Sequence, residues 1–135
     1  MPKRVLIAID WSPNAEKAFD YYVYHVHKKD CMLILSHYIE AGKPKEYMKK
    51  EQELLELQEV YENRLLQLKI NYEWLTGTGS APGEHIVSTA KERNCEMIIM
   101  GARGLGKIKK ALLGSVSDYV LKKSPCPVLV CKWND

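Results

Sequence analysis

The amino-acid sequence predicts an α/β fold: one open, five-stranded parallel sheet with helices on both faces, formed by a single domain that spans residues 1–135. Strands that helices cover above and below appear as short, unbroken apolar runs. Four such runs occur, at residues 5–9, 32–35, 97–100 and 128–130. The more mixed segment 70–75 is expected to be a fifth strand near an edge of the sheet.

Helical periodicity fills the stretches between these runs. Ser12 is expected to cap a first helix, with Pro13 at its first position. The charged segment 43–68 repeats apolar residues every three or four positions, which predicts a long amphipathic helix with one solvated face. Two shorter helices are expected at residues 82–91 and 115–123. The alternation of strand and helix indicates right-handed crossovers and a Rossmann-like sheet.

Composition narrows the class of protein. The chain is 46% hydrophobic and 27% charged, as is typical of globular proteins. A net charge of +3 is too small to indicate nucleic acid or a membrane as partner. The four cysteines form no CxxC pair, and each lies in or beside an apolar run, which favours buried thiols and a cytoplasmic location. Trp11 and Trp74 are expected to be packing groups, and His85 to lie at the surface.

Ligands of open parallel sheets bind beyond the carboxyl ends of the strands, where the strand order reverses. Three places therefore matter: Asp10 after the first run, residues 36–38 after the second, and Gly101 onward after the fourth. Asp10 could face a ligand or cap the helix that follows, and its position favours the ligand. His37 has no acidic or nucleophilic neighbour in the sequence, so a packed or hydrogen-bonded histidine is expected instead of a catalytic base.

The segment after the fourth strand is rich in glycine and in cations. Residues 101–114 contain four glycines, and four cations lie among residues 103–110. Glycine lets the backbone approach a ligand closely. The helix that begins near Gly114 has unpaired N–H groups in its first turn and a dipole that favours an anion. Together these features predict a phosphate site.

Three alternatives compete with this interpretation. A P-loop is rejected, because Ile108 stands where a serine or threonine must hold Mg²⁺. A dinucleotide fingerprint is rejected, because Lys109 replaces its third glycine and the motif does not follow the first strand. In the third alternative, residues 115–118 are only a capping box and the glycines only serve turns; this one stays open.

The spacing Gly101-x-x-Gly104, then nine residues, then Gly114-Ser115 resembles the G-2x-G-9x-G(S/T) loop of the ATP-binding members of the universal stress protein family. The likeness spans the chain. Residues 5–10, with Ser12 and Ala15, are similar to that family's first strand and helix start, and residues 97–104 and 114–131 are similar to its closing signature. The resemblance implies the Rossmann-like fold of adenine-nucleotide alpha hydrolases, and ATP as ligand with Mg²⁺ carried by its phosphates.

The same resemblance implies roles for single residues. Asp10 would face the ribose and adenine, with Ile9 and Tyr38 lining the base pocket. Tyr38 stands where a small aliphatic residue is common, so it either stacks on adenine or blocks it. The remaining contacts would be to the ribose and the phosphates, from Met100, Gly101, Arg103, Gly104, Gly114, Ser115, Val116 and Ser117.

The expected function is a nucleotide-dependent switch in a stress response, with at most slow ATP hydrolysis, because no convincing catalytic base is found. The alternative is a non-catalytic dimeric interaction module that needs no nucleotide.

The run Val128, Leu129 and Val130 is predicted to be an edge strand, which favours pairing with a second copy, and the resemblance also implies dimers joined along it. A nucleotide-processing enzyme is a third class, but residues 10–13 lack the serine-glycine-glycine loop usual there.

Overall fold

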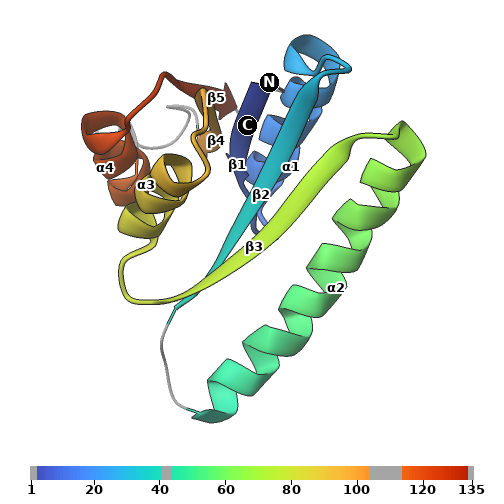
Figure 1. Cartoon of the computed structure of the whole chain (residues 1–135). Helices are drawn as coiled ribbons and strands as arrows, with labels where there is room; N and C mark the ends of the chain where they lie inside the picture. The colour runs from blue at the N-terminus through green and yellow to red at the C-terminus, as the bar shows by residue number, and fades with distance from the viewer. Residues whose placement is uncertain (1–2, 41–43, 104–113, 134–135) are drawn as a thin grey trace.

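The computed structural model describes residues 3–40, 44–103 and 114–133 (Figure 1). In chain order its elements are β1 (Lys3–Ala8), α1 (Pro13–Tyr21), the π-helical turn η1 (Tyr22–Val26), β2 (Cys31–Glu40), α2 (Pro44–Leu68), β3 (Asn71–Gly79), α3 (Pro82–Glu92), β4 (Met97–Arg103), α4 (Ser115–Lys123) and β5 (Val128–Trp133).

The strands form one parallel sheet in the order β3-β2-β1-β4-β5. The chain moves from β1 outward to β3, then crosses to the other side of β1 for β4 and β5, so the order reverses between β1 and β4. The predicted fold class is therefore confirmed, as is the edge position of the mixed strand, which is β3. The strand β5 forms the opposite edge.

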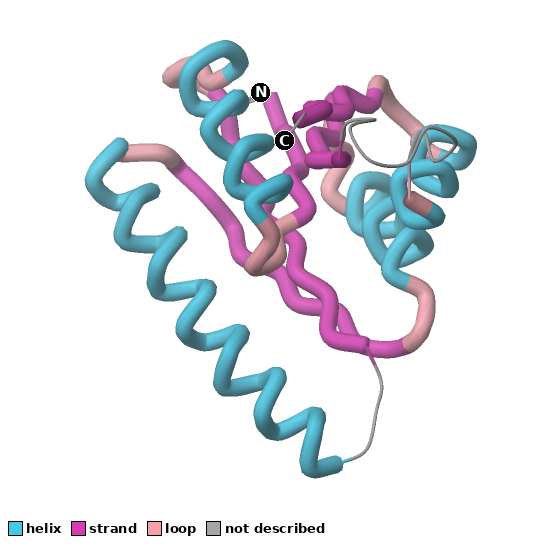
Figure 2. The backbone as a smooth tube through the Cα atoms, turned by 180° about the vertical axis from the view of Figure 1, so that it is seen from behind, coloured by secondary structure: helices cyan, strands magenta, loops and turns pink. Residues whose placement is uncertain are grey.

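Alternation of side chains along the strands divides the core into two layers. Val5 and Ile7 of β1 face the same side as Leu33 and Leu35 of β2, where α1 and α2 cover them. The residues between them, including Leu6, face the layer formed by α3 and α4. Figures 1 and 2 show α1 and α2 on one side of the sheet and α3 and α4 on the other. Both faces are thus buried, which explains the continuous apolar runs.

The first helix begins as its sequence predicts. The Ala15 amide donates to Ser12 Oγ at 3.2 Å, and Pro13 is the first helical residue. The Ser12 amide in turn donates to Asp10 Oδ1 at 2.7 Å. Asp10 therefore supports the turn into α1, and its second carboxylate oxygen is left for other contacts.

Four strands, β2 to β5, extend further toward their carboxyl ends than the sequence indicated, and in β2 and β4 the extension includes residues that were expected to follow the strand. β2 continues through residues 36–40, each of which pairs with β3, from Ser36 opposite Leu75 to Glu40 opposite Gly79. β4 likewise reaches Arg103 and contains Gly101. The expectation that residues 36–38 and Gly101 follow their strands was therefore wrong, because polar residues can continue a strand where one of its faces leaves the core.

Trp11 corrects a second expectation. Its side chain is 53% exposed, and its indole N–H donates to the Glu53 carbonyl of α2 at 3.2 Å. It therefore bridges the β1–α1 turn to α2 and does not pack in the core, whereas Trp74 does pack against the core of the α1/α2 layer. In the described residues, no helix has the length and apolar character that crossing a membrane requires.

Candidate functional site

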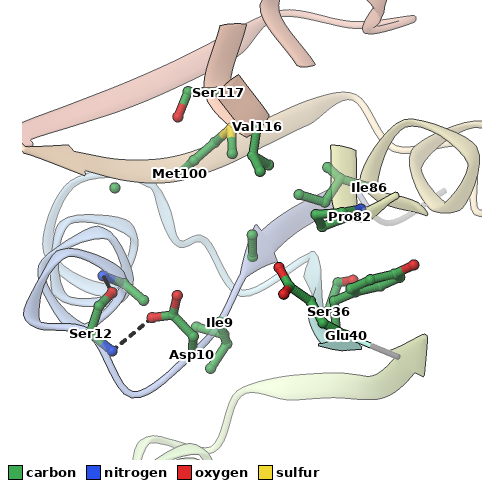
Figure 3. Close-up of a pocket in the computed structure, with 14 residues that line it drawn as sticks. Ile9, Asp10, Ser12, Ser36, Glu40, Pro82, Ile86, Met100, Val116 and Ser117 are labelled. Atoms are coloured by element: carbon green, nitrogen blue, oxygen red, sulfur yellow. Dashed lines mark hydrogen bonds between the residues drawn. The ribbon is translucent and has the colours of Figure 1, made fainter. Parts of the chain in front are cut away.

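A cavity of about 280 Å³ opens at the carboxyl edge of the sheet, where the strand order reverses between β1 and β4 (Figure 3). Residues from all three inner strands and from the first turns of α1, α3 and α4 line it. They are Ala8, Ile9, Asp10, Ser12, Ala15, Ser36, Tyr38, Glu40, Pro82, Ile86, Met100, Gly101, Val116 and Ser117. This is the position at which open α/β sheets hold ligands.

The floor of the cavity continues the α3/α4 layer of the core. Ala8 and Ser36 are register partners and follow Leu6 and Ile34 on the same face of their strands. Their small side chains stop short of α3, and this leaves space where larger apolar groups fill the core below. Pro82 of α3 lies on the opposite side of that space from Asp10 (Figure 3).

Gly101 has a packing role at this edge. A Cβ placed on it would lie 2.1 Å from the carbonyl oxygen of Asn14 in the first turn of α1. Only glycine therefore allows α1 to approach β4 so closely. At this position the missing side chain is explained by helix packing, and the residue still borders the cavity.

The first turn of α4 supplies the second side of the cavity. Gly114 is the N-cap, and no side chain of the described residues caps the helix. Asp118 pairs instead with Lys122, Nζ to Oδ2 at 3.0 Å. The capping-box alternative for residues 115–118 is therefore wrong. Because no side chain caps these N–H groups, the helix end favours an anion, and Ser117, only 7% exposed, lies on the cavity side of this turn.

Tyr38 forms part of the cavity wall. The Ala81 amide donates to its hydroxyl at 2.9 Å, and its ring lies 5.3 Å from that of His85. Two glycines of β3 make room for these rings, since a Cβ on Gly79 would lie 2.6 Å from the Tyr38 hydroxyl and one on Gly77 would lie 2.4 Å from the His85 ring. His85 is thus half-buried and not at the surface as expected, and its burial lowers its pKa.

The charges of the lining are unevenly distributed. Among the described residues that line the cavity, the ionisable acids are Asp10 and Glu40, and none is a lysine, arginine or histidine. His37 is not a lining residue of this cavity, and its Nδ1 lies 2.7 Å from the Ile9 carbonyl oxygen. Because a carbonyl oxygen only accepts hydrogen bonds, Nδ1 carries the proton. This confirms the hydrogen-bonded histidine expected there. Within the described residues, no group of side chains is arranged to hold a metal ion.

The structure brings together seven of the predicted site residues: Ile9, Asp10, Tyr38, Met100, Gly101, Val116 and Ser117. Ser115 lines a neighbouring groove of about 200 Å³ between α3 and α4 instead. Gly114 is exposed just before α4, and a Cβ there would meet no atom of the described residues within 4 Å. Arg103 ends β4 opposite Trp133, and Gly104 lies outside the described residues.

Half of the lining was not among the predicted site residues, although Ser36 lies in a segment that the sequence had placed near the ligand. These residues are Ala8, Ser12, Ala15, Ser36, Glu40, Pro82 and Ile86. Extending the strand alternation from Leu6 and Ile34 finds the floor and wall residues on β1 and β2. No sequence pattern places the α3 residues at the cavity, because their position depends on how α3 packs against the rest of the fold.

Comparison with known proteins places this geometry in a family. The family profile described as "Universal stress protein family" matches residues 1–132. Universal stress protein MJ0531 of Methanocaldococcus jannaschii is 40% identical over 65 residues, a match that covers 48% of this chain and 36% of that protein. The solved structure of MJ0577, from the same organism, is 31% identical, covers 98% of this chain and 97% of that one, and superposes with a TM-score of 0.72. A universal stress protein family protein of Arabidopsis thaliana, solved with AMP bound, shares the fold at 22% identity, covering 98% and 93% of the two chains with a TM-score of 0.77.

Proposed function

Since the chain belongs to the universal stress protein family, we propose that it binds an adenine nucleotide in the cavity at the carboxyl edge of the sheet. The ligand we propose is ATP, with Mg²⁺ carried by its phosphates, and the chain belongs to the subgroup with the G-2x-G-9x-G(S/T) loop. Its role is that of a nucleotide-dependent switch in a stress response, with at most slow hydrolysis.

One observation carries the proposal: the two ends of the cavity have opposite electrostatic character. At one end, the first turn of α4 has no side-chain cap and contributes Val116 and the Ser117 hydroxyl, which suits phosphate oxygens. At the other, the carboxylates of Asp10 and Glu40 accept hydrogen bonds and repel phosphate. A nucleotide satisfies both ends, because its phosphates are acceptors and its ribose hydroxyls and base amino group are donors.

Family members support the choice of ligand. The Arabidopsis thaliana protein of the same fold was solved with AMP, and another universal stress protein was solved with cAMP at 20% identity and a TM-score of 0.63. Both ligands carry adenine. The predicted phosphate contacts of Arg103 and Gly104 belong to this proposal, as does that of Ser115.

The switch has a physical route to the surface. Asp10 borders the cavity, and the next residue, Trp11, donates to the Glu53 carbonyl of α2. A ligand that moves the turn at Asp10 therefore also moves the contact with α2.

We propose a homodimer as well, joined along the edge strand β5 through Val128, Leu129 and Val130, each half-buried in the single chain. The second candidate function, a dimeric module that needs no nucleotide, rests on this same edge.

The enzyme class and the location remain part of the proposal. We propose slow turnover at most, since none of the hydroxyls among the described lining residues is paired with a base. All four cysteines are free, with Cys31 and Cys95 buried and Cys126 and Cys131 half-buried, which supports a reducing compartment such as the cytoplasm.

Titration calorimetry with Mg-ATP tests the function. We expect one site per chain with a dissociation constant below about 1 mM. Gly114→Val is expected to abolish binding, because its branched side chain occupies the approach to the first-turn amides of α4. Its melting temperature is expected to stay near normal, since nothing lies within 4 Å of a Cβ there. Thr78→Val, an exposed change on β3 outside the cavity lining, is the control.

The interpretation fails if the wild-type protein binds no adenine nucleotide at millimolar concentration. If Gly114→Val instead unfolds the chain, Gly114 serves the fold and not ligand binding. The dimeric module that needs no nucleotide then becomes the better explanation.

A further inference from the structure

Ser36 is a buried polar residue that the protein itself does not satisfy. It is 3% exposed and borders the cavity, yet its Oγ has no hydrogen-bond partner among the residues that the structure describes. Its backbone carbonyl is paired, since the Ile9 amide donates to it at 2.8 Å. A buried hydroxyl without a partner is unfavourable, and such groups in folded proteins are few. A hydroxyl left free in the wall of a ligand cavity indicates that the ligand supplies its partner.

Glu40 belongs to the same wall. Strand alternation places it, with Tyr38, on the face of β2 that carries Ser36. Figure 3 shows the labelled Ser36 and Glu40 together at one end of the cavity, away from Ser117. Within the described residues the Glu40 carboxylate has no hydrogen bond or ion pair, whereas the Tyr38 hydroxyl already accepts from Ala81. The wall therefore offers one free hydroxyl and one carboxylate that can only accept.

The opposite end of the cavity is the one suited to phosphate, because it contains the uncapped first turn of α4. A nucleotide that is held there extends its base toward β2 and α3. Pro82 and Ile86 of α3 give that base an apolar surface, and Ser36 and Glu40 face its polar edge. This placement rests on the proposed function.

Ser36 and Glu40 lie on the same face of β2, two alternate positions apart along the strand. Residues four apart on a strand are separated by about 13 Å, and a glutamate side chain that folds back shortens this gap. Both side chains border the same cavity, so one base can contact both. A carboxylate attracts the 6-amino group of adenine and repels the 6-oxo group of guanine or hypoxanthine, and a serine hydroxyl can donate to the adjacent ring nitrogen.

We infer that Ser36 and Glu40 are the base-reading residues of this cavity, and that they select adenine over 6-oxo purines: Glu40 accepts from the 6-amino group, and Ser36 donates to a ring nitrogen. The selection comes as much from repulsion of the wrong base as from attraction of the right one.

The test compares Mg-ATP with Mg-ITP, which carries the same ribose and phosphates but an oxo group in place of the 6-amino group. Calorimetry is expected to show that the wild-type protein prefers ATP by about tenfold or more. Glu40→Gln reduces the preference to about threefold or less, because a side-chain amide can also donate to the oxo group. Glu92→Gln, at the far end of α3 and outside the lining, keeps the wild-type preference.

Ser36→Ala separates base reading from a structural role. We expect ATP binding to weaken by about fivefold to tenfold, the usual effect of one lost hydrogen bond. The melting temperature of the nucleotide-free protein is expected to stay the same or to rise, because the hydroxyl makes no hydrogen bond to the described residues. A serine that stabilises the fold would show the opposite, a lower melting temperature.

The outcomes separate the two proposals. If the wild-type protein binds ATP, but Ser36→Ala and Glu40→Gln bind ATP and ITP as it does, the base-reading inference is overturned and the nucleotide site stands. A lower melting temperature for nucleotide-free Ser36→Ala also overturns it. If the wild-type protein binds neither nucleotide, the proposed function fails, and base reading fails with it.

Discussion

Gly101→Ala tests how tightly α1 packs against β4 at the edge of the cavity. The new Cβ would lie 2.1 Å from the Asn14 carbonyl oxygen and 2.4 Å from its carbon. Real Cβ contacts shorter than 3.0 Å are essentially absent from proteins, so one of the two segments must move by about 1 Å. The obstructing atoms are backbone atoms and cannot rotate away as a side chain could.

The expected cost follows from this displacement. Overpacking of a well-packed contact costs about 1–3 kcal/mol, and a clash with helix backbone belongs at the upper end of that range. For a chain of this length, 1 kcal/mol corresponds to a shift in melting temperature of about 3–4 °C, so we expect a loss of roughly 7–10 °C. Moving the start of α1 also displaces Ser12 and Ala15 in the cavity wall.

Gly114→Ala is the matched control at the other end of the glycine segment. Gly114 has an ordinary φ of −71°, and no atom of the described part of the chain lies within 4 Å of its new Cβ. Loss of a glycine N-cap is expected to cost less than about 1 kcal/mol. Urea unfolding followed by circular dichroism measures both variants. Equal stability of the two would refute the reasoning, since α1 could not then lie against β4 as described.

Three further predictions concern groups elsewhere in the fold. Burial raises the pKa of Cys95 to about 11, so its thiolate is suppressed in the folded state. Iodoacetamide at pH 8.5 should label it at least about tenfold more slowly in the native protein than in urea, and equal rates would contradict its burial. Burial lowers the pKa of His27 and of His85 below 6.5. As the pH falls, the unfolded state therefore binds protons at these histidines before the native state does. The native state loses stability below about pH 6.5 as a result. The urea midpoint should therefore drop between pH 7.5 and 5.5, and by less in a variant with glutamine at both positions; a pH-independent midpoint argues against the assignment. Trp11→Ala should cost less than about 1 kcal/mol and Trp74→Ala about 2 kcal/mol or more, as measured by urea unfolding, and the reverse order would mean that the exposed indole is the packing group.

The sequence predicted the strands correctly where both of their faces are buried. It ended them too early where one face is no longer buried. Residues 5–9 and 97–100 stand out because helices cover both sides of the sheet. Residues 36–40 of β2 are equally part of the ladder, but one of their faces borders a cavity and so carries Ser36 and Glu40. An apolar run records burial, not backbone pairing, and this is why the strand seemed to end at Leu35.

The candidate site shows the same division. The start of α4 at Ser115 could be predicted from the glycine before it, and so could the position of Asp10 at the switch point. The contribution of α3 could not, because Pro82 reaches the cavity only through the packing of α3 against α4. The free hydroxyl of Ser36 could not either, since a missing hydrogen bond is a property of the folded surroundings.

The most direct test of the nucleotide site is an NMR titration of the ¹⁵N-labelled protein with Mg-ATP. The account predicts that amide shifts concentrate in three segments that are distant in sequence, residues 9–12, 36–40 and 115–117, and that they saturate together with one dissociation constant. Absence of shifts at millimolar Mg-ATP, or shifts confined to segments outside the cavity, would contradict it.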